Sequence, residues 1–133
     1  MAAGNVEIVR RSFEAFERDG VEAMAELLAS DFEMVTPPEL ASEPGTYRGP
    51  EGLRRYFESF YDAMREVRIE PHRYHDLGDC VAVEFTLRAW GRTTGIETTI
   101  DGVQLWRMRD GVARRMDVYE ALEEALTAAR GDA

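Results

Sequence analysis

Two histidines are the first side chains in this sequence that could carry chemistry. Histidine changes its charge near neutral pH, so His72 or His75 could move a proton. The surrounding segment alternates like a β-strand, which places residues three apart on opposite faces. Two histidines so arranged cannot bind one metal ion together. His75 falls near the end of this predicted strand, where it could face either a pocket or the solvent.

Other reactive patterns are absent from the sequence. It has no glycine-rich phosphate loop, no HExxH pair and no cluster of cysteines. None of its serines stands in a nucleophile elbow. Cys80, the single cysteine, is most simply a small buried apolar residue, and it has no intrachain disulfide partner. We therefore expect no metal, nucleotide or flavin cofactor, and a reduced cytoplasmic setting.

Composition and charge narrow the class of protein. The chain has 133 residues, of which 44% are hydrophobic and 32% charged, and this predicts one globular domain over residues 1–133. A formal net charge of −10 would repel nucleic acid and anionic membranes. The sequence shows no membrane-spanning apolar run and no signal peptide pattern. Its basic residues are all arginine, which suggests a bacterial genome rich in G and C.

The elements that position these groups begin with helices. Apolar residues at spacings of three and four predict helices over 5–18, 21–29 and 50–65. A short strand is predicted at 31–35. Prolines and glycines between 36 and 50 predict an irregular connection, and connections of this length often form loops over functional sites.

The second half of the chain changes to strand-like alternation. Asp110-Gly111 is a strong hairpin signal, and Pro71 indicates an edge position or a bulge. Helices followed by antiparallel strands predict an α+β fold with the helices on one face of a sheet. Strands are predicted over 67–75, 81–90, 100–107 and 112–119, and a last helix is predicted over 120–129.

Several segments resemble the SnoaL-like family of the nuclear-transport-factor-2-like superfamily. The resemblance covers about residues 5–127, and its most characteristic parts are Tyr47-Arg48-Gly49 before a helix and Trp106 to Gly111 before the last strand. It implies a cone-shaped α+β fold, in which a strongly curved, mostly antiparallel sheet wraps around three N-terminal helices and an internal apolar pocket. Members include polyketide cyclases, steroid isomerases, epoxide hydrolases and dehydratases, so this fold does not settle the function.

The resemblance also implies one pocket carboxylate. In the limonene-epoxide-hydrolase branch an aspartate on the last strand lies in the pocket. The segment from Met116 to Glu120 aligns with it, so Asp117 takes that position. A partly desolvated carboxylate suits proton transfer. The alternative is structural, because Asp117 shares its strand face with Arg115 and could pair with it to fix the strand.

Other site residues of the family are not matched. The hydrolase branch needs an Arg-x-Asp on the middle strand, where this sequence has Val83 and Phe85. Its Tyr and Asn correspond to about Met34 and Thr36. Steroid isomerases place a general base directly before a proline, and here that residue is Thr36, whose hydroxyl is unsuited to the task. Neither catalytic set is complete.

Two polar side chains could assist Asp117. Tyr47 lies in the loop that could cover the pocket, where it could donate a hydrogen bond to a carbonyl or enolate oxygen, or simply anchor the loop. Gln104 shares a face with Ile100 and Trp106 that we expect to point inward, so its amide could bind a ligand oxygen or Asp117. The residues that we expect to line the pocket are Phe16, Phe60, Met64, Phe85, Leu87, Trp106, Arg115, Tyr119 and His75.

These observations predict a protein that binds a small, largely apolar molecule. If Asp117 moves a proton, the chain would be a cofactor-independent enzyme that isomerises, cyclises or dehydrates a polyketide- or terpenoid-like compound. The alternative is a ligand-binding or dimeric interaction module that catalyses no reaction.

The resemblance further implies a homodimer that forms through the outer face of the sheet. An apolar patch on this face would be unfavourable to expose in a monomer, which supports a two-fold interface. On our assignment the face carries Trp90, Val103, Leu105, Met116 and Val118.

Overall fold

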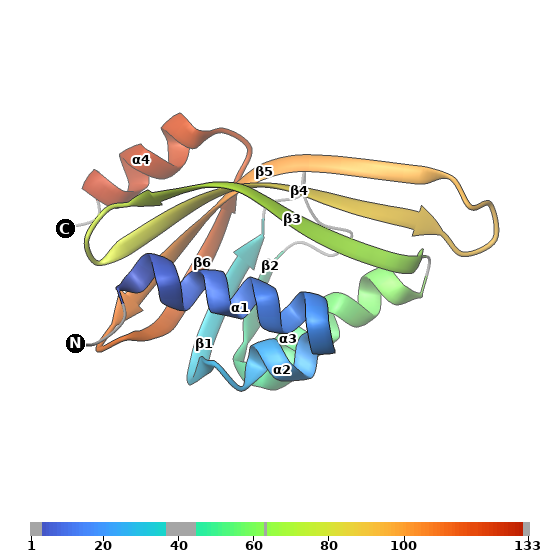
Figure 1. Cartoon of the computed structure of the whole chain (residues 1–133), viewed down its shortest axis with the longest axis horizontal. Helices are drawn as coiled ribbons and strands as arrows, with labels where there is room; N and C mark the ends of the chain where they lie inside the picture. The colour runs from blue at the N-terminus through green and yellow to red at the C-terminus, as the bar shows by residue number, and fades with distance from the viewer. Residues whose placement is uncertain (1–3, 37–44, 63, 132–133) are drawn as a thin grey trace.

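A computed structural model describes residues 4–36, 45–62 and 64–131 of the chain, and the side chain of Phe60 lies outside the described part. Among these residues, three of the four helices come early in the chain, and four consecutive strands follow before the last helix (Figure 1). In chain order they are α1 (Asn5–Asp19), α2 (Val21–Ala25), β1 (Leu28–Thr36), β2 (Gly45–Arg48), α3 (Gly49–Tyr61), β3 (Met64–Asp76), β4 (Cys80–Gly91), β5 (Glu97–Arg109), β6 (Val112–Tyr119) and α4 (Leu122–Gly131).

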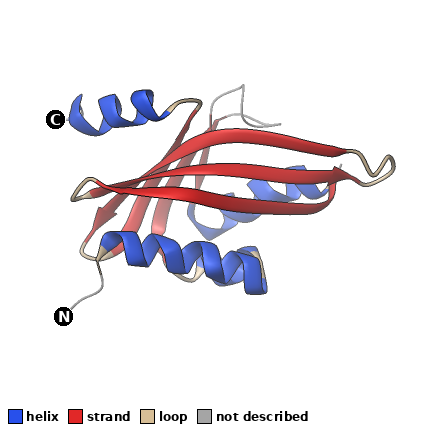
Figure 2. Ribbon diagram, turned by 45° about the horizontal axis from the view of Figure 1, so that its top comes forward, coloured by secondary structure: helices blue, strands red, loops and turns tan. Residues whose placement is uncertain are grey.

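The strands form one mixed sheet in the order β2-β1-β6-β5-β4-β3. The β1–β6 pair is parallel, and every other neighbouring pair is antiparallel. Figure 2 shows α1, α2 and α3 on one side of the strands, while α4 lies on the other. The predicted α+β fold with three N-terminal helices is therefore confirmed. We call the side facing α1–α3 the inner face and the side facing α4 the outer face.

The main core lies between the inner face and the first three helices. Apolar residues of α1 and α3, such as Val9, Phe13 and Phe57, pack against inner residues of the central strands. Trp106 of β5 lies at its centre and is only 1% exposed. Burial of such large side chains supplies the main driving force for folding.

A smaller apolar cluster holds α4 on the outer face. Ala125 of α4 is fully buried against Val103 and Leu105 of β5, together with Cys80 and Ala82 of β4. Cys80 is thus buried, as the sequence predicted. The C-terminal helix therefore covers the part of the outer face that would otherwise expose apolar residues.

Of the five residues predicted for the outer dimer face, Trp90, Val103 and Leu105 do lie on that face, the last two beneath α4, whereas the prediction is wrong for Met116 and Val118. Directly opposed residues of an antiparallel pair point to the same side of the sheet. Leu105 is opposed by Asp117, while Trp106 is opposed by Met116. Met116, and Val118 two residues on, therefore lie on the inner face with Trp106, and they belong to the main core.

Some boundaries differ from the predicted ones. The irregular stretch expected between 36 and 50 contains β2, which folds back antiparallel to β1. Gly49 follows β2 directly and begins α3. Its φ is +66°, a backbone conformation that favours glycine. The second helix ends at Ala25, and the third ends at Tyr61.

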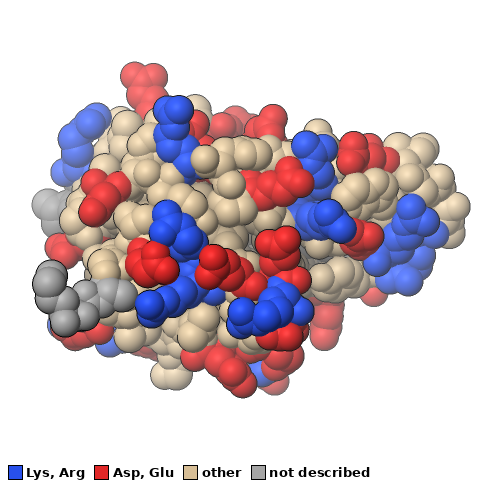
Figure 3. All heavy atoms as spheres, in the orientation of Figure 1, with Lys and Arg blue, Asp and Glu red and all other residues tan. Residues whose placement is uncertain are grey.

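Charged side chains of both signs are mixed over the face seen in Figure 3. Ion pairs also join separate elements, such as Arg54 of α3 with Glu22 of α2. The large negative charge of the chain therefore coexists with local pairing of opposite charges. No helix among the described residues is long and apolar enough to cross a membrane.

The docking of α4 gives a first prediction. Ala125→Glu would place a carboxylate among apolar groups without a partner, so we expect the free energy of unfolding to fall by about 2–3 kcal/mol. Thr127→Glu, at an exposed position of the same helix, should change it by less than about 0.5 kcal/mol. Urea titrations followed by circular dichroism measure both values. Equal effects of the two variants would show that α4 does not depend on this contact.

Candidate functional site

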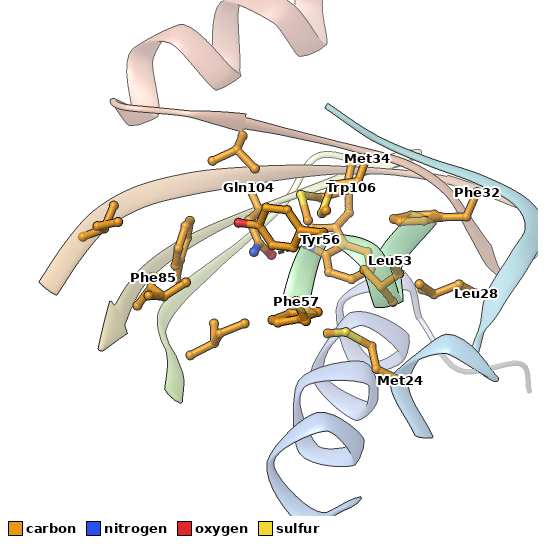
Figure 4. Close-up of a pocket in the computed structure, with 15 residues that line it drawn as sticks. Met24, Leu28, Phe32, Met34, Leu53, Tyr56, Phe57, Phe85, Gln104 and Trp106 are labelled. Carbon is orange, nitrogen blue, oxygen red and sulfur yellow. Dashed lines mark hydrogen bonds between the residues drawn. The ribbon is translucent and has the colours of Figure 1, made fainter. Parts of the chain in front are cut away.

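A small cavity lies between the inner face and the helices. Its free volume is about 30 Å³, which is room for about two water molecules. In Figure 4 the labelled side chains converge on it from α2, α3 and the strands. It is lined by Met24, Leu28, Phe32, Met34, Leu53, Tyr56, Phe57, Ile69, Phe85, Leu87, Ile100, Gln104, Trp106, Met116 and Val118.

Gln104 is the most polar side chain of this lining. It is 6% exposed, and its Oε1 accepts a hydrogen bond of 2.8 Å from the Trp106 indole nitrogen. Because the indole can only donate, this bond fixes the orientation of the amide. The amide nitrogen of Gln104 then retains two N–H donors, and no described residue accepts from them. The site therefore offers a fixed donor to an oxygen atom of a ligand.

Tyr56 of α3 is a second polar side chain in the lining, and it carries a hydroxyl group. Its ring packs edge-on against Tyr47, with 5.3 Å between the ring centroids, and it is 8% exposed. Burial, with a smaller contribution from Tyr47, raises the pKa of the Tyr56 hydroxyl well above its ordinary value. The hydroxyl therefore stays neutral, and it cannot act as a base near neutral pH.

Aromatic contacts hold the wall in place. Trp106 meets Phe13 of α1 edge-on at 5.8 Å and Phe32 of β1 at 6.1 Å between ring centroids. Phe57 of α3 lies 4.8 Å from Phe16 of α1. Because these rings come from two helices and two strands, the cavity is built by tertiary packing and not by one local motif.

The structure places four of the predicted site residues in the cavity lining: Phe85, Leu87, Gln104 and Trp106. Three others belong to the surrounding core without lining the cavity: Phe16, Tyr47 and Met64. Phe60 lies in α3, and its side chain is outside the described part. The expected inward direction of Gln104, Ile100 and Trp106 is therefore confirmed.

Asp117 lies on the outer face, so its predicted place in the pocket is wrong. Its neighbours Met116 and Val118 point into the cavity, and alternation turns Asp117 away. The Arg115 Nε donates a hydrogen bond of 2.8 Å to the Asp117 Oδ1, and this bond raises the pKa of the Arg115 guanidinium. Tyr119 Oη lies 3.5 Å from the other carboxylate oxygen. The structural alternative, an ion pair with Arg115, is what the geometry shows.

Arg115 and Tyr119 are turned away from the cavity with Asp117, and both predictions of pocket contact are wrong for the same reason.

His75 is also on the outer face, where its Nε2 lies 2.9 Å from Glu84. A bulge between Pro71 and Arg73 breaks the strand alternation, as Pro71 had indicated. His72 therefore reaches the same face and contacts Thr86. The described residues contain no group of three or more side chains suited to one metal ion.

Sequence reasoning missed most of the apolar lining on α2, α3 and β1. Tyr56 and Leu53 share one helix face with Phe57, and this spacing of three and four was a usable signal. Met116 and Val118 were also readable, because they form the apolar side of a strand whose other side is polar. Reliance on the family position of Asp117 reversed that assignment.

Comparison with known proteins identifies the fold. The family model of the SnoaL-like domain matches residues 9–116. No curated protein matches the chain. Among solved structures, an NTF2-like protein from Burkholderia thailandensis has a TM-score of 0.80 at 20% identity, with 99% of each chain covered.

Two further structures contain small molecules. TerC, co-crystallised with polyporic acid, has a TM-score of 0.77 at 24% identity, covering 96% of this chain and 99% of TerC. Rv0760c from Mycobacterium tuberculosis, in complex with estradiol-17beta-hemisuccinate, has a TM-score of 0.71 at 16% identity, covering 91% of this chain and 97% of that one. At these identities the similarity shows the fold alone.

The burial of Tyr56 predicts a pH effect on stability. A tyrosine whose pKa is raised in the folded state stabilises the fold below its unfolded pKa of about 10 and loses this effect as pH rises. Between pH 8 and pH 11 the wild type should therefore lose about 1.4 kcal/mol more unfolding free energy than Tyr56→Phe. Urea titrations at both pH values test this. Parallel losses in the two proteins would contradict a buried, neutral Tyr56.

Proposed function

The chain belongs to the SnoaL-like domain family, and from this premise we propose that it binds a small, largely apolar molecule in the cavity under the sheet. The observation that carries the proposal is the lining, in which Gln104 and Tyr56 are the polar side chains besides the indole of Trp106. Mostly apolar walls with a few fixed polar groups are typical of small-molecule sites. The conical pocket predicted from the sequence would be this cavity in its ligand-bound form.

Relatives of the same fold support this proposal. TerC and Rv0760c were crystallised with polyporic acid and with a steroid hemisuccinate, respectively. Both compounds combine a carbon-rich body with oxygen atoms. By analogy, the apolar walls of this chain would contact the body of a ligand, and the Gln104 N–H would donate to a ligand oxygen.

A ligand larger than water must displace side chains, because the cavity holds only about 30 Å³. Three of the lining residues, Met24, Met34 and Met116, are well suited to such movement. Methionine is unbranched and polarisable, so it repacks around different shapes at small cost. We therefore infer that the methionines adjust the cavity to the ligand.

Binding without reaction is the function that this cavity supports best. Among the described residues its lining contains no carboxylate and no imidazole, and the Tyr56 hydroxyl is held neutral. Proton transfer inside the cavity would therefore lack a suitable base. The predicted catalytic roles of Asp117, Tyr47 and Gln104 remain predictions, and for Asp117 the substrate would have to contact the outer face.

The predicted homodimer also remains a prediction, but on a changed surface. Val103 and Leu105 of the outer face are covered by α4. Beyond α4 this face carries ion pairs, such as Arg88 with Glu70, next to the half-buried Trp90. A two-fold interface on this region would therefore be polar and would weaken at high salt.

Naphthalene is a suitable first probe of the cavity. We expect a saturable shift of the Trp106 indole N–H signal in ¹H–¹⁵N NMR spectra, because this group lies in the wall. The indole of Trp90, on the outer face, should not shift. Val118→Phe fills the cavity and should lower the affinity at least tenfold, whereas Val35→Phe, on the outer face of β1, should not. Absence of saturable binding by the wild type would overturn the proposed function.

Asp117→Asn separates cavity binding from chemistry on the outer face. Because Asp117 does not line the cavity, naphthalene affinity should stay within about twofold of wild type. The weakened ion pair with Arg115 should lower the free energy of unfolding by about 1 kcal/mol. NMR titration and urea unfolding of the same variant measure both quantities. A tenfold loss of affinity in a folded variant would place Asp117 in contact with the ligand.

A further inference from the structure

One buried hydroxyl on the inner face has no hydrogen-bond partner. Thr36, the last residue of β1, is 3% exposed. Within the described part of the chain, its Oγ1 is the one fully buried side-chain oxygen or nitrogen atom that has no hydrogen-bond partner. A buried polar group without a hydrogen bond destabilises the folded state by about 1–3 kcal/mol. Such groups are rare and call for a specific explanation.

Other buried hydroxyls in this protein are paired. Thr86 lies on the outer face and is 7% exposed. Its Oγ1 donates a hydrogen bond of 2.6 Å to Asp101 Oδ1, and the His72 Nε2 lies 2.7 Å from the Thr86 Oγ1. Ser12 of α1, 1% exposed, bonds to the carbonyl oxygen of Ile8. The unpaired state of Thr36 is therefore not a general feature of hydroxyls in this fold.

Strand register places Thr36 in one row with Gln104. The parallel ladder pairs Met34 with Met116 and Val35 with Asp117, so the next position sets Thr36 beside Val118. The antiparallel ladder pairs Val118 with Gln104. Two strand spacings separate the backbones of Thr36 and Gln104, about 10 Å.

Alternation also turns Thr36 toward the cavity side of the sheet. Met34 and Phe32, two and four residues before it, both line the cavity. Val118, its neighbour in the row, lines the cavity as well. The hydroxyl thus lies at the edge of an apolar wall, and the fixed amide donor of Gln104 lies across Val118 from it.

We propose that Thr36 and Gln104 are the two polar contacts of the ligand, and that the ligand is an apolar ring compound with an oxygen function at each end. Gln104 donates an N–H to one oxygen, and the Thr36 hydroxyl donates to or accepts from the other. Val118 and the methionines contact the body between them. This inference rests on the proposed function, because it requires a ligand in the cavity.

Matched probes and matched variants test this role of Thr36. The probes are naphthalene, which has no oxygen, and 2,6-dihydroxynaphthalene, which has one at each end. Thr36→Val removes the hydroxyl and keeps the shape of the side chain. Thr86→Val removes a paired hydroxyl of the outer face, and so controls for the loss of a buried hydroxyl elsewhere. NMR titrations give the affinities, and urea titrations give the stabilities.

We expect Thr36→Val to be at least as stable as wild type, because the buried hydroxyl that it removes has no partner. Its affinity for 2,6-dihydroxynaphthalene should fall about five- to tenfold, while its affinity for naphthalene stays unchanged. Thr86→Val should lose stability and bind both probes like wild type.

Several outcomes would overturn this role of Thr36. If Thr36→Val loses stability and keeps the wild-type preference between the probes, the hydroxyl is structural. If stability and preference are both unchanged, a bound water satisfies the hydroxyl and the ligand does not. In both cases naphthalene binding would leave the proposed function standing. If neither probe binds the wild type, the inference and the proposed function both fail.

Discussion

The hydrogen bond between Trp106 and Gln104 is the interaction on which the interior depends. Trp106 is among the largest fully buried side chains, and its indole N–H requires an acceptor that water cannot supply. Gln104, two residues away on the same strand face, supplies it at 2.8 Å. The bond allows an indole to occupy the centre of the core, and it leaves the amide N–H groups toward the cavity. Under the proposed function, this one pair serves both packing and recognition.

The two faces of the sheet separate apolar from charged chemistry. The inner face combines aromatic, aliphatic and methionine side chains with one amide and one unpaired hydroxyl. The outer face carries the carboxylates and histidines, including Asp117, His72 and His75, and each of these has a polar partner. This separation explains why the described lining of the cavity lacks an acid–base group while titratable residues lie one strand position away.

The sequence alone predicts most of the fold but only part of the site. Apolar spacing located the helices and alternation located the long strands, because each pattern reports local burial. Strand pairing depends on contacts between distant segments, so β2 could not be read from spacing alone. The outward direction of Asp117 could be read from the apolar side of its own strand, but the family position of this residue favoured the opposite assignment. The bulge at Pro71 changed the face of His72. Gln104 was correctly placed, because its strand shows a clear inner face with Ile100 and Trp106.

The empty site carries free-energy costs that a purely structural core would not need. By the relation between cavity volume and stability, a void of 30 Å³ costs about 0.7 kcal/mol. The unpaired Thr36 hydroxyl adds about 1–3 kcal/mol. A valine at position 36 and a larger side chain at position 118 would remove both costs without changing the fold. A ligand that filled the cavity and hydrogen-bonded to Thr36 would remove the same costs, so part of its affinity would come from this relief. Thr36 and Val118 lie in one row with the fixed amide of Gln104, and this coincidence favours the proposed binding site over an imperfectly packed interior.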